Sequence, residues 1–565
     1  MKRRRPPRPV LLGAALAVAT GFAARADAPP AAAPTGFVLR TFGTPSPTDP
    51  AEHAAALLVP RAYTPERPWP LLVAVHGAFS THVENLRRAL GMRGDGGAWP
   101  DPPMLVLSPL GGGELMAYDG LGEDDVLRAI DDVRRAYNVD RDRIYLTGLS
   151  MGGGGTWSIG LSHPDLFAAL VPVCGVVDPR QWIDDRDRAL YDLDALELGM
   201  PPGLAENALN QRVFFFHGDA DRVVPVGDSR RMRDRFKALG WLGKSVRYVE
   251  LPGVGHNAWD DAYRDGNVFR LLEGIRRPAF PARVWFKAAS LRHARAYWTR
   301  IDRIDRAPAE IDARQRDGAF KVRVAGASGF SLLFDRAFVA PARTITVRVE
   351  DGPAGASAHA SAIPSAIYNG PAGDALSFAR DGGRWHPVAA PVSGEPPPVA
   401  VVGLASRSLP RQGPHAYVYG TDGPAATVAA ARRLAEALAD WGPGVRARFP
   451  VLADRDLTDE LTARLHLILI GDGATNRVVR RLAARAPLPI AAGASDGDRS
   501  YRLLVRDAFL PGRHVLIFGA RSPAAFTHLQ RRFARPNSES WAPEPNLAYI
   551  QLDAAGEAEK IRRSD

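Results

Sequence analysis

A serine at position 150 lies in a sequence that favours nucleophilic chemistry. It is the centre of Gly148-Leu149-Ser150-Met151-Gly152, directly after the apolar run at residues 143–147, which predicts a strand. A serine flanked by glycines between a strand and a helix lies on a sharp turn, where its hydroxyl projects beyond the end of the sheet. The start of the following helix also favours developing negative charge. With 54 glycines in the chain, the five-residue pattern alone is close to a chance match. Its position between strand and helix therefore carries the prediction.

Acidic residues and a histidine follow Ser150 in the order that a Ser–acid–His mechanism on such a sheet requires. Asp219 and Asp221 lie in the loop after the predicted strand at 213–217, and His256 comes after the predicted strand at 245–251. The imidazole would take the proton of the serine hydroxyl, and a carboxylate would hold the imidazole in the right tautomer. We expect His217, at the end of its own strand, to be structural.

An acyl-transfer site also needs two backbone amides that stabilise the oxyanion. Met151, the residue after the serine, supplies the first. The second is expected from the loop that follows the predicted strand at 71–76, with Ala78 as the first choice and Phe79 as the alternative.

Four aromatic residues are candidates for substrate contact, although each is equally consistent with core packing. They are Phe79, Trp182, Trp259 and Tyr263.

The elements around these residues alternate between short apolar runs and amphipathic helices. The helix expected at 124–137 has apolar residues at helical spacing, and the alternation predicts a parallel sheet with crossover helices over residues 27–280. The expected strands are 71–76, 104–108, 143–147, 168–173, 213–217 and 245–251. Residues 180–210 are long enough for either a small cap over the site or an irregular crossover.

Residues 71–260 resemble the prolyl-oligopeptidase-type and dienelactone-hydrolase-like branch of the α/β-hydrolases, which includes secreted feruloyl, acetyl-xylan and polyhydroxybutyrate-depolymerase-like esterases. The motifs that carry the resemblance lie at 137–140, 148–157, 163–169, 217–221 and 253–256. The resemblance implies an α/β-hydrolase fold and selects Asp221 over Asp219, which gives a triad of Ser150, Asp221 and His256. Prolyl oligopeptidases also carry a large β-propeller. Only about 45 residues of the expected mature chain precede the first core strand, which favours an open site suited to esters.

Residues 281–565 divide into three segments with different sequence patterns. Residues 281–350 have short alternating runs that predict a small β-rich module, and 351–411 have the Pro, Gly and Ala content of linker and turns. Residues 412–565 return to alternation and predict a second, smaller α/β domain, with one strand expected at 446–452. Its turn at 471–476 could place a phosphate at a helix start, but it lacks dinucleotide or P-loop spacing, so we expect an ordinary turn.

The first 26 residues have the form of a cleavable signal peptide. A basic start is followed by an apolar run at 10–24, shorter than the roughly 20 residues that span a bilayer. We therefore expect cleavage after Ala26, export to the periplasm or the medium, and no stable membrane insertion.

The net charge, the cysteine content and the spacing of possible metal ligands argue against several other classes of function. Residues 1–26 hold six basic residues and no acidic one, so their removal lowers the net charge from +10 to +4, too little to indicate a nucleic-acid partner. Cys174 is the single cysteine and is expected to pack in a buried strand rather than to act as a nucleophile. No cluster has metal-ligand spacing, so we expect neither a metal nor a cofactor.

These features together predict an exported carboxylic-ester hydrolase that forms an acyl-enzyme on Ser150. A serine peptidase of prolyl-oligopeptidase type is the first alternative, and a non-catalytic binding protein that keeps the fold is the second. The partner is expected to be an ester or peptide substrate, and the oligomeric state stays open.

Overall fold

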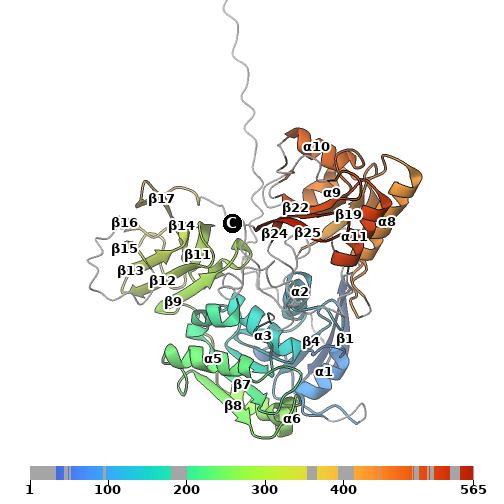
Figure 1. Ribbon diagram of the computed structural model, residues 1–565. Helices are drawn as coiled ribbons and strands as arrows, with labels where there is room; N and C mark the ends of the chain where they lie inside the picture. The colour runs from blue at the N-terminus through green and yellow to red at the C-terminus, as the bar shows by residue number, and fades with distance from the viewer. Residues whose placement is uncertain are drawn as a thin grey trace, which may run out of the picture.

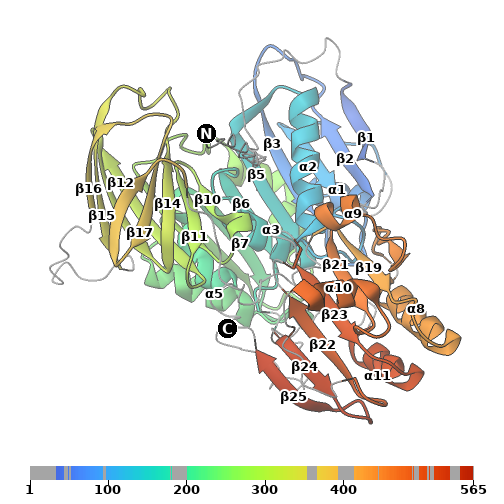
Figure 2. The same ribbon diagram turned by 90° about the horizontal axis from the view of Figure 1, so that it is seen from above.

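Four sheets organise the part of the chain that the computed structural model describes. The described residues are 34–43, 49, 52–92, 97–178, 180, 200–352, 366–391, 413–442, 444–485, 488, 495–505, 508–509, 514–534 and 547–563. The expected signal peptide lies outside this part. The sheets form an N-terminal domain (residues 36–272), a β module (283–388) and a C-terminal domain (413–563). Figures 1 and 2 show both later modules against the N-terminal domain, the β module on the left and the C-terminal domain on the right.

The N-terminal domain is built on an eight-stranded sheet with the order β1-β2-β4-β3-β5-β6-β7-β8. β1 and β2 pair antiparallel, β2 pairs antiparallel with β4, and the strands from β4 to β8 in this order run parallel. The strands are β1 (Gly36–Gly43), β2 (His53–Val59), β3 (Trp69–Val75), β4 (Leu105–Pro109), β5 (Val139–Leu149), β6 (Ala169–Val173), β7 (Arg212–Gly218) and β8 (Val246–Leu251). All six expected strands are confirmed. β1 and β2, which the sequence did not reveal, extend the sheet at one edge.

Helices cover both faces of this sheet, which is why its central strands are continuous apolar runs. α2 (Leu121–Ala136), α3 (Met151–Ser162) and α5 (Gly227–Ala238) share one core cluster with the sheet. α1 (His82–Ala89), α6 (Trp259–Tyr263) and α7 (Asn267–Leu272) pack in a second cluster. α2 is the helix expected at 124–137. Of the possible cap at 180–210, residues 181–199 lie outside the described part, and η3 (Pro201–Asn210) is a 3₁₀ helix.

The β module is a pair of five-stranded sheets that share one hydrophobic core. Its strands are β9 (Arg283–Ala288), β10 (Arg295–Ala296), β11 (Thr299–Ile304), β12 (Ala309–Arg316), β13 (Ala319–Ala325), β14 (Ala327–Leu333), β15 (Thr344–Asp351), β16 (Ala366–Pro371), β17 (Ala375–Asp381) and β18 (Arg384–Val388). The expectation of linker and turns is therefore wrong for residues 366–388. Their large apolar residues are sparse, yet Phe378 stacks on Phe330 of β14 at 5.0 Å, and Trp385 also packs on Phe330. Long-range pairing, not local composition, makes these strands.

The C-terminal domain has a seven-stranded sheet with the order β20-β19-β21-β23-β22-β24-β25. Its strands are β19 (His415–Tyr419), β20 (Val451–Ala453), β21 (His466–Ile470), β22 (Ser500–Val505), β23 (Val515–Gly519), β24 (Leu547–Leu552) and β25 (Ala558–Arg563). Its helices are α8 (Ala425–Ala439), α9 (Asp459–Arg464), α10 (Arg477–Arg485) and α11 (Pro523–Phe533). The strand expected at 446–452 begins only at Val451, and Arg446, its expected first residue, hydrogen-bonds to the N-terminal domain instead.

A buried carboxylate joins the N-terminal domain to the β module. Glu123 of α2 is 3% exposed, and its Oε1 lies 2.6 Å from His163 Nε2 and 2.8 Å from Nε2 of His293, a residue of the β module. Arg292 Nε donates to the other carboxylate oxygen at 3.2 Å. Burial alone would raise the pKa of Glu123, but the two histidines hold that pKa well below its usual value. We interpret the cluster as an ionic link between the two modules.

The Glu123→Gln variant is expected to lose about 3 kcal/mol of unfolding free energy at pH 7, because its partners lose a buried countercharge. The folded-state pKa of Glu123 lies below its unfolded value, so this contribution is complete above pH about 4.3 and is lost as the pH falls toward the folded pKa. Urea denaturation at pH 7 and pH 3.5 measures both effects. Glu436→Gln, which breaks an exposed pair with Arg432, is the control. A variant as stable as this control at pH 7 would contradict the prediction.

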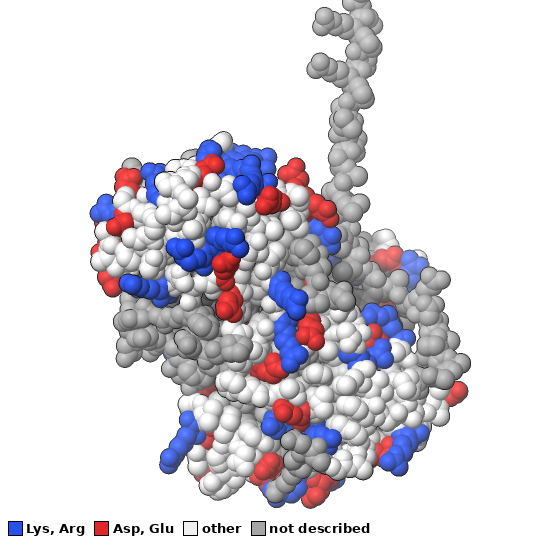
Figure 3. Space-filling view, turned by 90° about the vertical axis from the view of Figure 1, so that its right-hand side faces the viewer, with Lys and Arg blue, Asp and Glu red and all other residues white. Residues whose placement is uncertain are grey.

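Charged side chains of both signs lie interspersed on the face of the molecule drawn in Figure 3. Among the helices that the structure describes, none combines the length and the apolar character that a membrane crossing requires.

Candidate active site

Ser150 lies on a strained turn between β5 and α3. Its φ of +56° and ψ of −118° are rarely adopted by a residue with a side chain, and such strain costs about 1–3 kcal/mol. The turn leaves no room beside the backbone. A Cβ added at Gly148 would lie 2.4 Å from the carbonyl oxygen of Gly152, and one added at Gly152 would lie 2.2 Å from that of Val75. The glycines around the serine are therefore required by close packing of backbone against backbone.

The structure brings Ser150, His256 and Asp221 into one hydrogen-bonded chain. His256 Nε2 lies 2.9 Å from Ser150 Oγ, and His256 Nδ1 lies 2.7 Å from Asp221 Oδ2. The three residues follow β5, β8 and β7, whose carboxyl ends meet at one edge of the parallel sheet. A carboxylate beside Nδ1 places the proton there, so Nε2 is left to accept the proton of the serine hydroxyl.

The carboxylate of Asp221 is surrounded by donors. Its Oδ1 accepts the amides of Val223 and Val224 at 2.8 and 3.0 Å, and its Oδ2 lies 3.2 Å from His217 Nε2 in addition to its contact with His256. Burial alone would raise the pKa of Asp221, but these hydrogen bonds outweigh it and hold the pKa well below its usual value. The group is therefore ionised throughout the neutral range and can stabilise an imidazolium.

Asp219, the other acid of the loop, has a different environment. Its Oδ1 accepts the amide of Gly253 at 2.7 Å, in an exposed turn. This contact ties together the loops after β7 and β8. The geometry thus distinguishes two aspartates only two positions apart.

Two buried residues, His217 and Cys174, contact members of the hydrogen-bonded chain. His217 Nδ1 lies 2.7 Å from Ser229 Oγ, and its Nε2 contacts Asp221, so this histidine is a hydrogen-bond partner of the acid as well as a structural residue. Its i, i+4 spacing from Asp221 at a strand end is the signal that sequence reasoning could have used. Cys174 lies just after β6, where its Sγ donates to the carbonyl of His256 at 3.3 Å. Burial raises the pKa of this thiol, which keeps it protonated and a poor nucleophile.

Two backbone amides beside Ser150 are free to face an oxyanion. Met151 is the first residue of α3, so its amide has no acceptor within the helix. The amide of Ala78 makes no hydrogen bond within the described part of the chain, whereas the amide of Phe79 donates to the carbonyl of Glu114 at 3.0 Å. A Cβ added at Gly77 would lie 3.5 Å from Ser150 Cβ, so this loop is adjacent to the serine. The structure therefore favours Ala78 over Phe79 as the second donor.

The aromatic candidates for substrate contact separate into distinct groups. Phe79 is 74% exposed at a φ of +61°, and the ring of Trp259 packs edge-on against His256 with centroids 5.3 Å apart. Tyr263 is a core residue instead, because it is buried and its hydroxyl lies 2.9 Å from Thr147 Oγ1. Trp182 lies outside the described residues.

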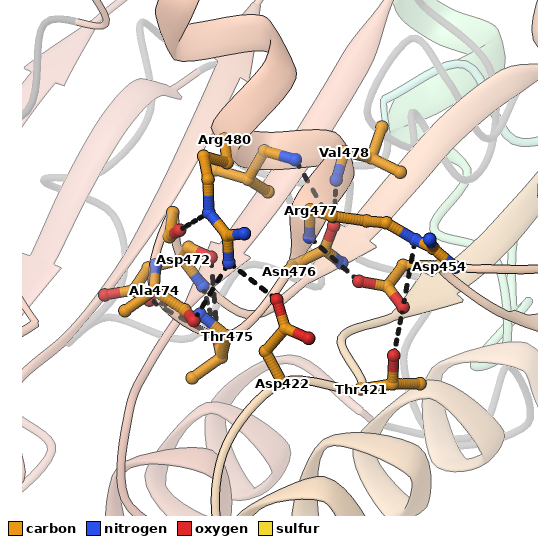
Figure 4. A network of polar contacts seen from close by, with 12 residues as sticks. Thr421, Asp422, Asp454, Asp472, Ala474, Thr475, Asn476, Arg477, Val478 and Arg480 are labelled. Carbon is orange, nitrogen blue, oxygen red and sulfur yellow. Dashed lines mark hydrogen bonds and ion pairs between the residues drawn. The ribbon is translucent and has the colours of Figure 1, made fainter.

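The turn at 471–476 of the C-terminal domain is occupied by its own side chains (Figure 4). Asn476 Oδ1 accepts the amides of Val478 and Val479, and Asp454 Oδ2 accepts that of Arg477 at 2.8 Å. These are the first amides of α10, the groups that a phosphate would need. The turn therefore has the ordinary structural role that we expected.

Comparisons with known proteins found relatives of part of the chain. Residues 120–273 match the model of the prolyl oligopeptidase family. A bifunctional acetylxylan esterase/xylanase from Neocallimastix patriciarum is 31% identical over 208 residues, which cover 33% of this chain and 29% of the relative. The chain thus spans less than a third of the length of this curated relative.

Solved structures of esterases and peptidases also match the chain. A thermostable esterase has 28% identity and a TM-score of 0.33, with coverage of 43% of this chain and 63% of its own. A ferulic acid esterase has 18% identity and a TM-score of 0.31, with coverage of 42% and 100%. The acylaminoacyl peptidase of Pyrococcus horikoshii has 19% identity and a TM-score of 0.32, with coverage of 43% and 43%.

The family match includes Ser150, Asp221 and His256, and the sheet order places all three at one edge. Residues 120–273 are therefore a segment of the prolyl oligopeptidase family within a domain of α/β-hydrolase type.

Proposed function

We propose that this chain is an exported serine hydrolase that cleaves carboxylic esters through an acyl-enzyme on Ser150. The observation that carries the proposal is the hydrogen-bonded chain from Ser150 Oγ through His256 to Asp221. The basic start and apolar run of residues 1–26 support the export part of the proposal.

Acylation begins when Ser150 Oγ attacks the ester carbonyl and passes its proton to His256 Nε2. Asp221, already ionised, stabilises the imidazolium through Nδ1–H. The carbonyl oxygen becomes an oxyanion that accepts hydrogen bonds from the amides of Met151 and Ala78. Collapse of this intermediate breaks the ester C–O bond, and the alcohol leaves with the proton from His256.

Deacylation repeats these steps with water as the nucleophile. His256 takes a proton from the water, the hydroxide attacks the acyl carbonyl, and Ser150 Oγ leaves with the proton that His256 returns. The products are a carboxylic acid and the free serine, so one water is consumed per ester. The exposed edge of His256, whose side chain is 20% exposed, is compatible with entry of water to this position.

Two features support an ester over an amide substrate. The 31% identical relative is named as an acetylxylan esterase. In addition, Phe79 is exposed and His256 is partly exposed, so a bulky alcohol or a polymer can approach the site. The name of the matched family favours a peptidase instead. The assay must therefore distinguish peptidase activity from esterase activity.

Parallel assays of p-nitrophenyl acetate, acetylated xylan and a proline-containing peptide p-nitroanilide test the proposal. We expect clear ester turnover with little amide turnover, and mass spectrometry of the same preparation should show a chain that begins at Asp27. Amide turnover without ester turnover would favour the peptidase. A chain that a fluorophosphonate does not label at Ser150 would support the non-catalytic alternative.

A further inference from the structure

The C-terminal domain contacts the N-terminal domain close to residues 77–79, the loop that contains the candidate oxyanion donor Ala78. Residues 444–446 lie between two segments of the N-terminal domain and hydrogen-bond to both. The amide of Arg446 donates to the carbonyl of Gly112 at 2.6 Å, and the amide of Leu115 donates to the carbonyl of Gly444 at 2.7 Å. On the other side, the amide of Glu52 donates to the carbonyl of Arg446 at 2.8 Å. The segment is thus held at both edges, in the manner of a short added strand.

Glycines on both sides make this approach possible. A Cβ added at Gly113, which has a φ of +129°, would lie 2.4 Å from the carbonyl oxygen of Gly444. Gly444 itself has a φ of +85°, and a Cβ there would lie 3.0 Å from Leu115 Cγ. Met116 and Leu121 extend the contact, because they share a buried cluster with apolar residues of α8 and α11. The C-terminal domain is therefore docked by packing as well as by hydrogen bonds.

Glu114 connects this contact to the site. Its side chain accepts from Arg446 Nη2 at 2.6 Å, and its neighbours Gly112 and Leu115 form the two backbone bonds to residues 444–446. Its own carbonyl accepts the amide of Phe79 at 3.0 Å. Phe79 follows Ala78, so this bond ties Glu114 to the residue next to the candidate oxyanion donor.

We propose that residues 444–446 of the C-terminal domain are a positioning element for the hydrolase site, with Arg446 holding the Glu114 loop and, through it, the oxyanion donor Ala78. This inference rests on the proposed hydrolase function and assigns the C-terminal domain a part in it. Arg446 touches no reacting atom. Its effect is to keep the amide of Ala78 where the developing oxyanion needs it, and displacements of about 1 Å in such a donor can cost up to about 100-fold in rate.

The test compares Arg446→Met with the parent chain. We expect the kcat for p-nitrophenyl acetate and the rate of fluorophosphonate labelling at Ser150 to fall about tenfold, with KM changed less than about twofold, because only stabilisation of the transition state is weakened. Arg446→Lys keeps a donor for Glu114 and should restore most of the labelling rate. Glu114→Gln removes the same ion pair from the other side and should reproduce the loss of kcat and labelling rate. The double variant should lose little more than either single variant, because both changes remove one interaction.

Arg432→Met is the matched control, since Arg432 lies on α8 of the same domain and pairs with Glu436 on the surface. It should label at the parent rate. Parent-like labelling of both Arg446→Met and Glu114→Gln would overturn the inference while leaving the hydrolase function intact. A parent chain that is not labelled at Ser150 would instead overturn the proposed function on which the inference rests.

Discussion

Replacement of Ser150 by alanine is expected to lower ester turnover by about a millionfold, to the level that binding and oxyanion stabilisation alone provide. The reason is that Ser150 Oγ is the only atom in the hydrogen-bonded chain that can form the acyl bond. Its partners His256 and Asp221 would remain in place without a nucleophile. Initial rates with p-nitrophenyl acetate and labelling by a fluorophosphonate measure the loss.

The control for this experiment is Ser158→Ala on the same helix. Ser158 Oγ donates to backbone carbonyls at 3.3 Å and lies two turns away from Ser150, so its removal should leave activity and labelling unchanged. The turn at Ser150 is strained, and alanine can adopt it no more easily than serine. We therefore expect the Ser150→Ala chain to fold as the parent does, and wild-type activity in it would exclude the proposed mechanism.

Replacement of Asp221 by asparagine is expected to lower kcat by about 10⁴-fold. Asparagine keeps the shape of the side chain but loses the charge that stabilises the imidazolium. It can also present an N–H toward His256 Nδ1, which favours the tautomer with the proton on Nε2 and so removes the acceptor of the serine proton. Steady-state kinetics at pH 7 to 9 measure the loss.

Asp219→Asn provides the matched control two positions away. Its carboxylate accepts the amide of Gly253 in an exposed turn, and an asparagine oxygen can accept the same bond. We expect this variant to keep at least about half of the parent activity, as surface changes usually do. A larger loss from Asp219→Asn than from Asp221→Asn would show that the acid has been assigned to the wrong aspartate.

The sequence by itself predicted the parallel part of the N-terminal sheet, β3 to β8, and the edge at which the candidate site lies. Parallel strands buried on both faces are apolar runs that stand out locally, and the carboxyl ends of such strands meet at one edge. The positions of Ser150, Asp221 and His256 after three of these strands therefore brought them together in the prediction. The sequence also indicated why glycines flank Ser150: a sharp turn there crowds the backbone, and the structure shows that a turn so close to β3 tolerates no side chain.

The sequence did not reveal the β1–β2 pair at the edge of the N-terminal sheet, nor three strands of the β module. Those three, β16, β17 and β18, lie among small residues; β16 pairs with β15, β17 pairs with β14, and β18 pairs with β17 in turn. A local composition typical of turns was outweighed there by cross-strand packing. The strand expected at 446–452 was also too long: it begins only at Val451, and Arg446 bonds instead to a segment of the N-terminal domain more than 300 positions away.

Local sequence alone did not separate the residues of two neighbouring pairs: the resemblance selected Asp221 over Asp219, and the position in the loop selected Ala78 over Phe79. Asp221 and Asp219 differ by two positions, and Ala78 and Phe79 by one, so their sequence contexts are almost the same. What separates them is the partner that the fold presents: His256 to Asp221, the amide of Gly253 to Asp219, and the carbonyl of Glu114 to Phe79. The sequence thus predicted the chemistry and the sheet edge where it would lie, because both predictions follow from local patterns. The individual donor and acceptor atoms depend on contacts between distant segments, and only the folded chain could decide them.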